Sequence, residues 1–117
     1  EVLRGRYLVE GPGHCAECHT ARNLAGGFIT GRWLAGAPNP DGDGRIPNIT
    51  PHDSGVGEWT VVDIAEYLSS GFTPDYDVAG SSMAEVVENT ARLSETDRRA
   101  IARYLLSIPA LEKGKAD

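Results

Sequence analysis

Apolar side chains recur every three or four residues at both ends of the chain and in its second half, a spacing that predicts amphipathic helices. Near the N-terminus, Leu3, Tyr7 and Leu8 share one face of a helix predicted over residues 2–10. The glycine-proline-glycine sequence at 11–13 ends this helix, because neither residue type supports a helix interior.

Capping residues mark two helix starts in the second half of the chain. Thr60 and Asp63 have the spacing of a capping box, with Asp in place of the usual Glu, and Gly71 stops the helix that they begin. Ser94 is placed to cap the last helix, which Pro109 closes. Between these two helices, the sequence MAEVVENTARL predicts one more.

The middle of the chain, residues 20–58, is rich in glycine, proline, asparagine and aspartate. It shows no alternation of apolar and polar residues, so no strand is predicted there. A loop of this length is unusual inside a compact domain unless it wraps around something. We therefore expect an all-α fold that forms a single domain over residues 1–117, with a flexible tail at about 110–117.

Composition narrows the classes of protein that fit this pattern. The chain has 117 residues and 40% apolar residues, but no apolar run approaches the roughly 18 residues of a membrane span. Its net charge of −6 makes nucleic acid and anionic membranes poor partners. No charged leader with an apolar stretch opens the sequence, so any export signal is expected to have been removed or omitted.

The sequence GPGHCAECHT contains the only two cysteines, Cys15 and Cys18, followed directly by His19. A Cys-x-x-Cys pair is compatible with a redox disulfide, half of a zinc site, a plain disulfide or haem attachment. The redox motif belongs in a βαβ context, which the pattern lacks, and a zinc site needs a second pair of ligands. The adjacent histidine favours covalent haem, with thioethers at both cysteines and His19 on the iron.

Met83 is the only methionine, and it lies well downstream of the cysteine motif, after glycine and serine, where a predicted helix begins. A lone methionine is usually a core residue. In a haem protein this position allows a loop to present its sulfur to the second face of the ring. We therefore expect His19 and Met83 to be the axial ligands of a six-coordinate iron with a relatively high potential.

Several blocks of sequence together resemble class I c-type cytochromes over nearly the whole chain. They are GRYLV, CAECHT, GRIPNITP, GVGEWTVVDIAEYLSSGFTPD and GSSMAEVVENTARLSETDRRAIARYLLSIPA. The chain is most similar to monohaem domains in cytochrome c subunits of bacterial membrane-bound quinoprotein and flavoprotein dehydrogenases. The resemblance implies the class I cytochrome c fold, with three to five helices and long loops around one covalent haem c.

The resemblance also implies roles for residues outside the cysteine motif. The first and last helices would cross at Gly5 and Tyr104, with Tyr7 or Leu8 beside them. Trp59 resembles a tryptophan that lies near a haem propionate, although burial in the core explains it equally well.

Further side chains are candidates for contacts with the propionates. Asn48 and Thr50 would donate hydrogen bonds to them, and Arg45 or Arg32 would neutralise their charge.

One feature departs from the family pattern. Many class I members have a proline after the haem motif, in a Gly-Pro-x-Leu setting, whose carbonyl orients the ligating histidine. In this chain the corresponding sequence is GRWL, with Arg32 in place of the proline. Some other carbonyl must then accept the proton of the His19 ring.

Two other features have ordinary explanations. The sequence NPDGDGRI matches the first half of a calcium loop, with oxygen ligands and turn residues at Asn39, Asp41, Asp43, Gly44 and Ile46. Thr50 occupies the glutamate position and no helices flank the loop, so a solvated turn is the better account. His14 and His52 are expected to be surface or loop residues, with His52 a weak candidate to replace Met83 on the iron.

These expectations converge on an electron-transfer protein that transforms no substrate by itself. The resemblance implies redox protein partners, such as a dehydrogenase, reductase or terminal oxidase, and a periplasmic location, free or within a membrane-bound complex. The alternative is a sensor or binder of nitric oxide or carbon monoxide in which Met83 is labile. A third interpretation, a peroxidase-like activity, would need a distal acid/base residue that the sequence does not identify.

Overall fold

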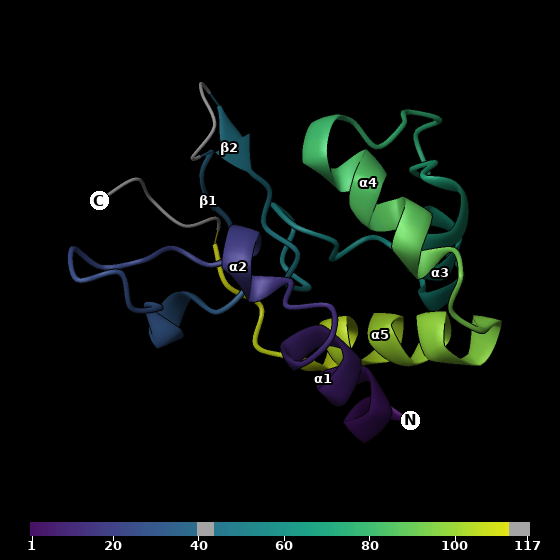
Figure 1. The fold of residues 1–117 in the computed structure, drawn as a ribbon, viewed down its shortest axis with the longest axis horizontal. Helices are drawn as coiled ribbons and strands as arrows, with labels where there is room; N and C mark the ends of the chain where they lie inside the picture. Colours follow the sequence, from purple (N-terminus) through teal and green to yellow (C-terminus); the bar gives the residue numbers. More distant parts are fainter. Residues whose placement is uncertain (40–43, 113–117) are drawn as a thin grey trace.

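The computed structural model describes residues 1–39 and 44–112, which form five α-helices joined by long loops (Figure 1). The helices are α1 (Val2–Glu10), α2 (Ala16–His19), α3 (Val61–Ser70), α4 (Ser81–Thr90) and α5 (Glu95–Ser107). A 3-10 turn, η1 (Thr30–Arg32), and two short strands, β1 (Ala37–Pro38) and β2 (Arg45–Ile46), lie between α2 and α3. The predicted class of fold, three to five helices with long loops, is confirmed.

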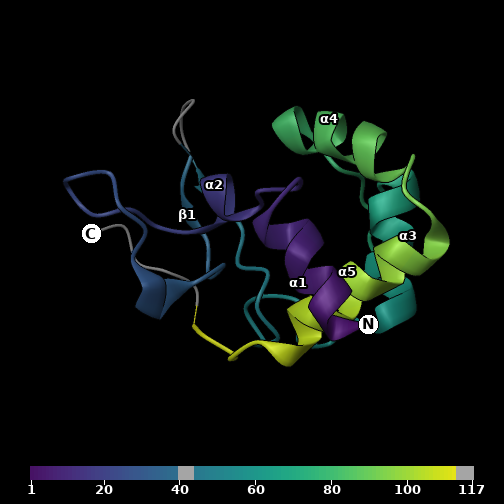
Figure 2. The same ribbon diagram turned by 60° about the horizontal axis from the view of Figure 1, so that its bottom comes forward.

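The two terminal helices, α1 and α5, pack together at Gly5 (Figure 2). A Cβ atom added to Gly5 would lie 1.9 Å from the Ala100 carbonyl oxygen and 2.8 Å from the Cβ of Tyr104. The helices therefore reach this distance only because residue 5 has no side chain. Gly5 and Tyr104 lie at the crossing, as the family resemblance predicted.

A chain of hydrogen bonds fastens the loop region to this helix pair. The Trp33 indole N–H donates to the Tyr104 hydroxyl over 3.2 Å, and this hydroxyl donates to the Glu10 carboxylate over 2.9 Å. On the opposite flank, the Arg4 guanidinium forms a 3.0 Å ion pair with Asp97. Residues from α1, α5 and the loop after α2 are thereby joined.

The capping residues behave as predicted. The Thr60 hydroxyl accepts from the Asp63 backbone N–H while the Asp63 carboxylate accepts from the Thr60 N–H, which completes a capping box. Gly71 ends α3 in the left-handed region, with a φ of 83°. Ser94 caps α5, which ends two residues before Pro109 because the residue before a proline disfavours helix.

Two details of the helices differ from the prediction. The short helix α2 was not expected, since four residues carry no apolar periodicity. Helix α4 begins two residues before Met83, so Met83 lies in its first turn and not in the preceding loop.

The expectation that the middle of the chain has no strands is wrong. Strands β1 and β2 pair antiparallel, with Ala37 opposite Ile46 and Pro38 opposite Arg45. A parallel bridge joins Thr20 to Gly36, and the Ile49 N–H donates to the Leu34 carbonyl. These pairings were missed because a strand of two residues is too short to show period-two alternation.

The sequence NPDGDGRI, which was expected to form a solvated turn, and the expected tail both include residues that the structure does not describe, namely 40–43 and 113–117. The ends of NPDGDGRI are described: the Asn39 N–H donates to the Gly44 carbonyl, and strands, not helices, flank the segment. Of the tail, residues 110–112 are described, and Leu111 is hydrogen-bonded to the loop before α3.

The buried core contains residues from every helix except α4. Helix α4 contacts the core through the half-buried Met83. The buried members of the core are Leu8, Val9, Ala16, Leu34, Val56, Ile64, Leu68, Ile101, Ala102, Tyr104 and Leu105. Helix α3 packs against both α5 and α4. Within the described ranges, no helix is long and apolar enough to cross a membrane.

The crossing at Gly5 predicts a large effect of a single methyl group. Gly5→Ala should lower the free energy of unfolding by about 1–3 kcal/mol or more, because the added Cβ overlaps the backbone of α5. Urea denaturation of the purified protein measures this change. Gly31→Ala is the matched control, since a Cβ at Gly31 meets nothing within 4 Å. Equal stabilities of the two variants would contradict the packing described above.

Candidate functional site

The cysteine motif is held by the end of α1 and by one turn of helix. Cys15 stands at the N-cap of α2, and its N–H donates to the Val9 carbonyl over 3.2 Å. The His19 N–H donates to the Cys15 carbonyl over 3.0 Å, which completes the turn. Because residues three and four apart share a helix face, Cys15, Cys18 and His19 lie on one side of this turn.

The two thiols are free and differ in environment. Cys15 is half-buried beside the core, and this burial raises the pKa of its thiol, with the nearby Cys18 as a minor contributor in the same direction. Cys18 is exposed. The raised pKa favours the thiol form of Cys15 over the thiolate.

The zinc interpretation finds no support in the described part of the chain. No group of three or more His, Cys, Asp or Glu side chains is placed there to hold a metal ion. A structural zinc site requires four such ligands.

His19 is buried, and its ring is oriented by one hydrogen bond. Its Nδ1 atom lies 2.8 Å from the Pro47 carbonyl oxygen. A carbonyl only accepts, so Nδ1 carries the ring proton and Nε2 keeps a lone pair. Burial lowers the pKa of His19, and the bond to Pro47 opposes this shift only in part, so the neutral ring is favoured.

Pro47 is the residue that sequence reasoning missed. The prediction that a carbonyl other than one at position 32 accepts the His19 proton is confirmed, and the acceptor belongs to Pro47 in the GRIPNIT sequence. The proline of the family pattern was sought in GRWL, next to the haem motif. The pairing of β2 with β1 helps to bring residue 47 back to the motif. The signal that could have identified Pro47 was its presence in GRIPNITP, one of the sequences that resemble the family.

Glycine at position 36 allows the approach of Pro47. The Gly36 N–H donates to the His19 carbonyl over 2.7 Å, and its φ of 95° lies in the left-handed region. A Cβ atom at Gly36 would lie 2.8 Å from the Ile46 carbonyl oxygen and 3.0 Å from the Asn48 nitrogen. Gly36 thus contacts the backbone on both sides of Pro47.

Met83 is half-buried in the first turn of α4 and packs against the core cluster. In both ribbon views, α2 and α4 lie apart, on either side of the middle of the molecule (Figures 1 and 2). His19 and Met83 are therefore carried by separate elements, α2 and α4.

The propionate candidates have different surroundings. Trp59 is half-buried, and its ring meets the Tyr67 ring edge to face at 5.8 Å. Arg45 is half-buried in β2. Asn48 and Thr50 are almost fully buried, and their side chains bond within the chain.

His52 belongs to a local turn. Its Nδ1 atom accepts from the Ser54 N–H over 3.0 Å and lies 2.9 Å from the Ser54 hydroxyl. His14 is exposed, with a φ of 33°. Both histidines are loop residues, as predicted.

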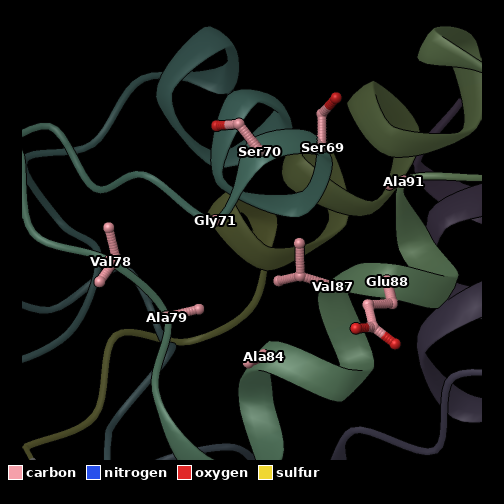
Figure 3. A pocket seen from close by; sticks show the side chains of 9 residues that line it. All are labelled: Ser69, Ser70, Gly71, Val78, Ala79, Ala84, Val87, Glu88 and Ala91. Carbon is pink, nitrogen blue, oxygen red and sulfur yellow. The ribbon is translucent and has the colours of Figure 1, made fainter.

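A cavity of about 330 Å³ lies elsewhere, between the end of α3 and the face of α4 (Figure 3). Small and apolar residues line it, with Glu88 at its side. It contains none of the predicted ligands and is separate from the cysteine motif.

Comparison with known proteins finds relatives that are named as cytochromes or as cytochrome subunits of dehydrogenases. No model of a protein family matches the chain. The chain is 64% identical over 112 residues to a diheme cytochrome c-type protein of Cereibacter sphaeroides. The aligned residues make up 96% of the chain and 37% of that relative.

Two further relatives are cytochrome subunits of dehydrogenases. The cytochrome c subunit of a quinone alcohol dehydrogenase of Gluconobacter oxydans is 41% identical, over 98% of the chain and 25% of the relative. The cytochrome subunit of fructose dehydrogenase of Gluconobacter japonicus is 44% identical, over 92% of the chain and 22% of the relative. The chain thus spans between 22% and 37% of the length of these three relatives.

The contacts of Gly36 generate a second prediction. Gly36→Ala should destabilise the protein by about 1–3 kcal/mol more than Gly26→Ala, as measured by urea denaturation. Both glycines have positive φ, but a Cβ at Gly26 meets nothing within 4 Å, so the control isolates the steric contact. If Gly36→Ala loses no more stability than Gly26→Ala, the backbone around Pro47 can move to accommodate the added Cβ, and the steric explanation is wrong.

Proposed function

Because the chain is a c-type cytochrome related to the cytochrome subunits of dehydrogenases, we propose that it carries single electrons on one covalently bound haem c. The observation that carries this proposal is the geometry of the cysteine motif. Cys15, Cys18 and His19 share one helical turn, and the bond from His19 to Pro47 leaves Nε2 available. The chain is an electron carrier and not an enzyme.

The donor set fits haem c. Cys15 and Cys18 would form the two thioethers, and His19 Nε2 and the Met83 sulfur would be the axial ligands. When bound, haem supplies a one-electron iron couple whose potential depends on its ligands, hydrogen bonds and burial. The chain's own residues orient the His19 imidazole through the Pro47 carbonyl and hold the Met83 side chain in the first turn of α4.

Exposed apolar side chains favour the proposal that the chain binds a haem. Phe72 and Val78 form an antiparallel bridge in the segment that leads to α4, and both are more than half exposed. Residues directly opposite each other in such a bridge point to the same face. Contact with a bound haem would cover this apolar pair, which the chain itself leaves exposed.

Trp59 and Arg45, which are both half-buried, are the residues that we propose to lie near the haem propionates. Asn48 and Thr50 were also expected to donate hydrogen bonds to the propionates, but each would have to release hydrogen bonds that it makes within the chain.

The proposed partners are redox proteins, with a dehydrogenase as donor and a respiratory protein as acceptor. The relatives are named as subunits of dehydrogenases, and the net charge of −6 favours a partner with a basic contact surface. We place the protein in the periplasm, because haem c of this kind is attached outside the bacterial cytoplasm.

Met83 ligation is tested by Met83→Leu, which keeps the volume of the side chain and removes its sulfur. The exchange conserves volume, so its effect on packing should be less than about 1.5 kcal/mol. Loss of the iron–sulfur bond would add to this cost in the haem-loaded protein. The oxidised variant should lose the far-red sulfur-to-iron absorption band, and the reduced variant should bind carbon monoxide while the parent protein does not. A parent protein that lacks the band and binds carbon monoxide readily would point to a gas sensor or binder instead.

Covalent attachment is tested by single Cys15→Ser and Cys18→Ser substitutions in a host that attaches haem. Each should leave at most one thioether, and the double variant should retain no haem after denaturation, as judged by haem staining of the denatured chain. His14→Ala is the neighbouring control and should retain full staining, because His14 is exposed. Staining of the double variant would rule out thioether attachment at these residues.

A further inference from the structure

The Pro47 carbonyl that orients His19 is not held by regular secondary structure. Strand β2 ends at Ile46, one residue earlier, and Pro47 itself is exposed. The carbonyl belongs to the peptide unit that joins Pro47 to Asn48, so its direction depends on how Asn48 is fixed.

Asn48 is only 4% exposed, and its side chain is fully engaged. Its Oδ1 atom accepts from the Thr50 N–H and from the Thr50 hydroxyl, each over 2.8 Å. Its Nδ2 atom donates to the Ser54 hydroxyl over 2.9 Å and to the Leu111 carbonyl over 2.7 Å. An asparagine amide has two donors and two acceptor positions, so none is left for an external ligand.

Thr50 completes this set of bonds from the other side. It is fully buried, and its hydroxyl accepts from the Leu111 N–H over 3.1 Å. Leu111 lies four residues beyond the end of α5. Its backbone therefore ties the segment after the last helix to the loop that carries Pro47.

We infer that Asn48 and Thr50, bonded to the Leu111 backbone, are positioning residues that hold the Pro47 carbonyl against His19 Nδ1 and thereby set the strength of His19 as an iron ligand. The inference rests on the proposed function, since it assigns His19 to the iron. It replaces the expected role of these two side chains at the propionates.

The physical link is the basicity of the imidazole. A hydrogen bond from Nδ1–H to a well-placed acceptor raises the basicity of a metal-bound histidine, which stabilises the more highly charged ferric iron. If the carbonyl is held less firmly, His19 becomes a weaker donor and the midpoint potential rises. The Nδ1 proton also exchanges with solvent more readily, because its hydrogen bond opens more often.

The test compares hydroxyl-to-methyl substitutions at two threonines in the haem-loaded protein. In Thr50→Val, the Nδ1 proton of His19 in the reduced protein should exchange at least roughly tenfold faster by NMR, as expected for loss of one buried hydrogen bond. The midpoint potential should rise. Thr50→Ser keeps the hydroxyl and should restore both values.

Thr60→Val is the matched control, because the Thr60 hydroxyl caps α3 and makes no bond to this network. It should lower stability but leave the exchange rate and the potential unchanged. Ser54→Ala, at an exposed position, removes one of the two acceptors of Asn48 Nδ2 together with the contact between the Ser54 hydroxyl and His52, and it should give a smaller change in the same direction. It serves as the second test if Thr50→Val does not fold.

The inference is overturned if Thr50→Val, or Ser54→Ala in its place, loses stability while the Nδ1 exchange and the potential match the parent protein. It falls together with the proposed function if the parent protein shows no His19 ring signals displaced by a bound haem. The two failures are distinguishable, because only the second one appears in the parent protein.

Discussion

The approach of α1 to α5 at Gly5 is the constraint on which the position of the cysteine motif depends. An added Cβ would lie 1.9 Å from the Ala100 carbonyl oxygen, so the two helices are in backbone contact. The end of α1 then holds the motif directly, because the Val9 carbonyl accepts from the Cys15 N–H. The segment after α5 holds the other side, since Leu111 is bonded to Asn48 and Thr50. The segments on both sides of His19 are therefore held by bonds to the end of α1 and to the segment after α5.

This arrangement explains how a short helix and irregular loops can hold a ring nitrogen in a defined direction. Helix α2 is a single turn and would be unstable alone. It is fixed by the Gly36 N–H, which donates to the His19 carbonyl, and by the Pro47 carbonyl, which accepts from the His19 ring. The loops replace regular structure with specific main-chain bonds, and close backbone approach at glycine makes these bonds possible.

Some apolar residues form a buried core, whereas others remain exposed beside α4. The core fills the space between α1, α3 and α5, whereas Phe72 and Val78 beside α4 stay more than half exposed. A domain of this size buries a modest core from its chain alone. The haem proposed above would supply additional apolar surface to cover such residues.

The sequence by itself determined the local features, because each depends on residues close together in the chain. The capping box at Thr60, the stop at Gly71 and the Cys15-x-x-Cys18-His19 motif could all be predicted, and the fold class followed from them. The tertiary structure alone decided which carbonyl meets His19, where Asn48 and Thr50 place their hydrogen bonds, and that β1 pairs with β2. The bond from His19 to Pro47 spans 28 positions, the bonds of Asn48 and Thr50 to Leu111 span 61 to 63 positions, and the paired strands have only two residues each. No local pattern encodes them, because they depend on the path that the packed helices impose on the loops.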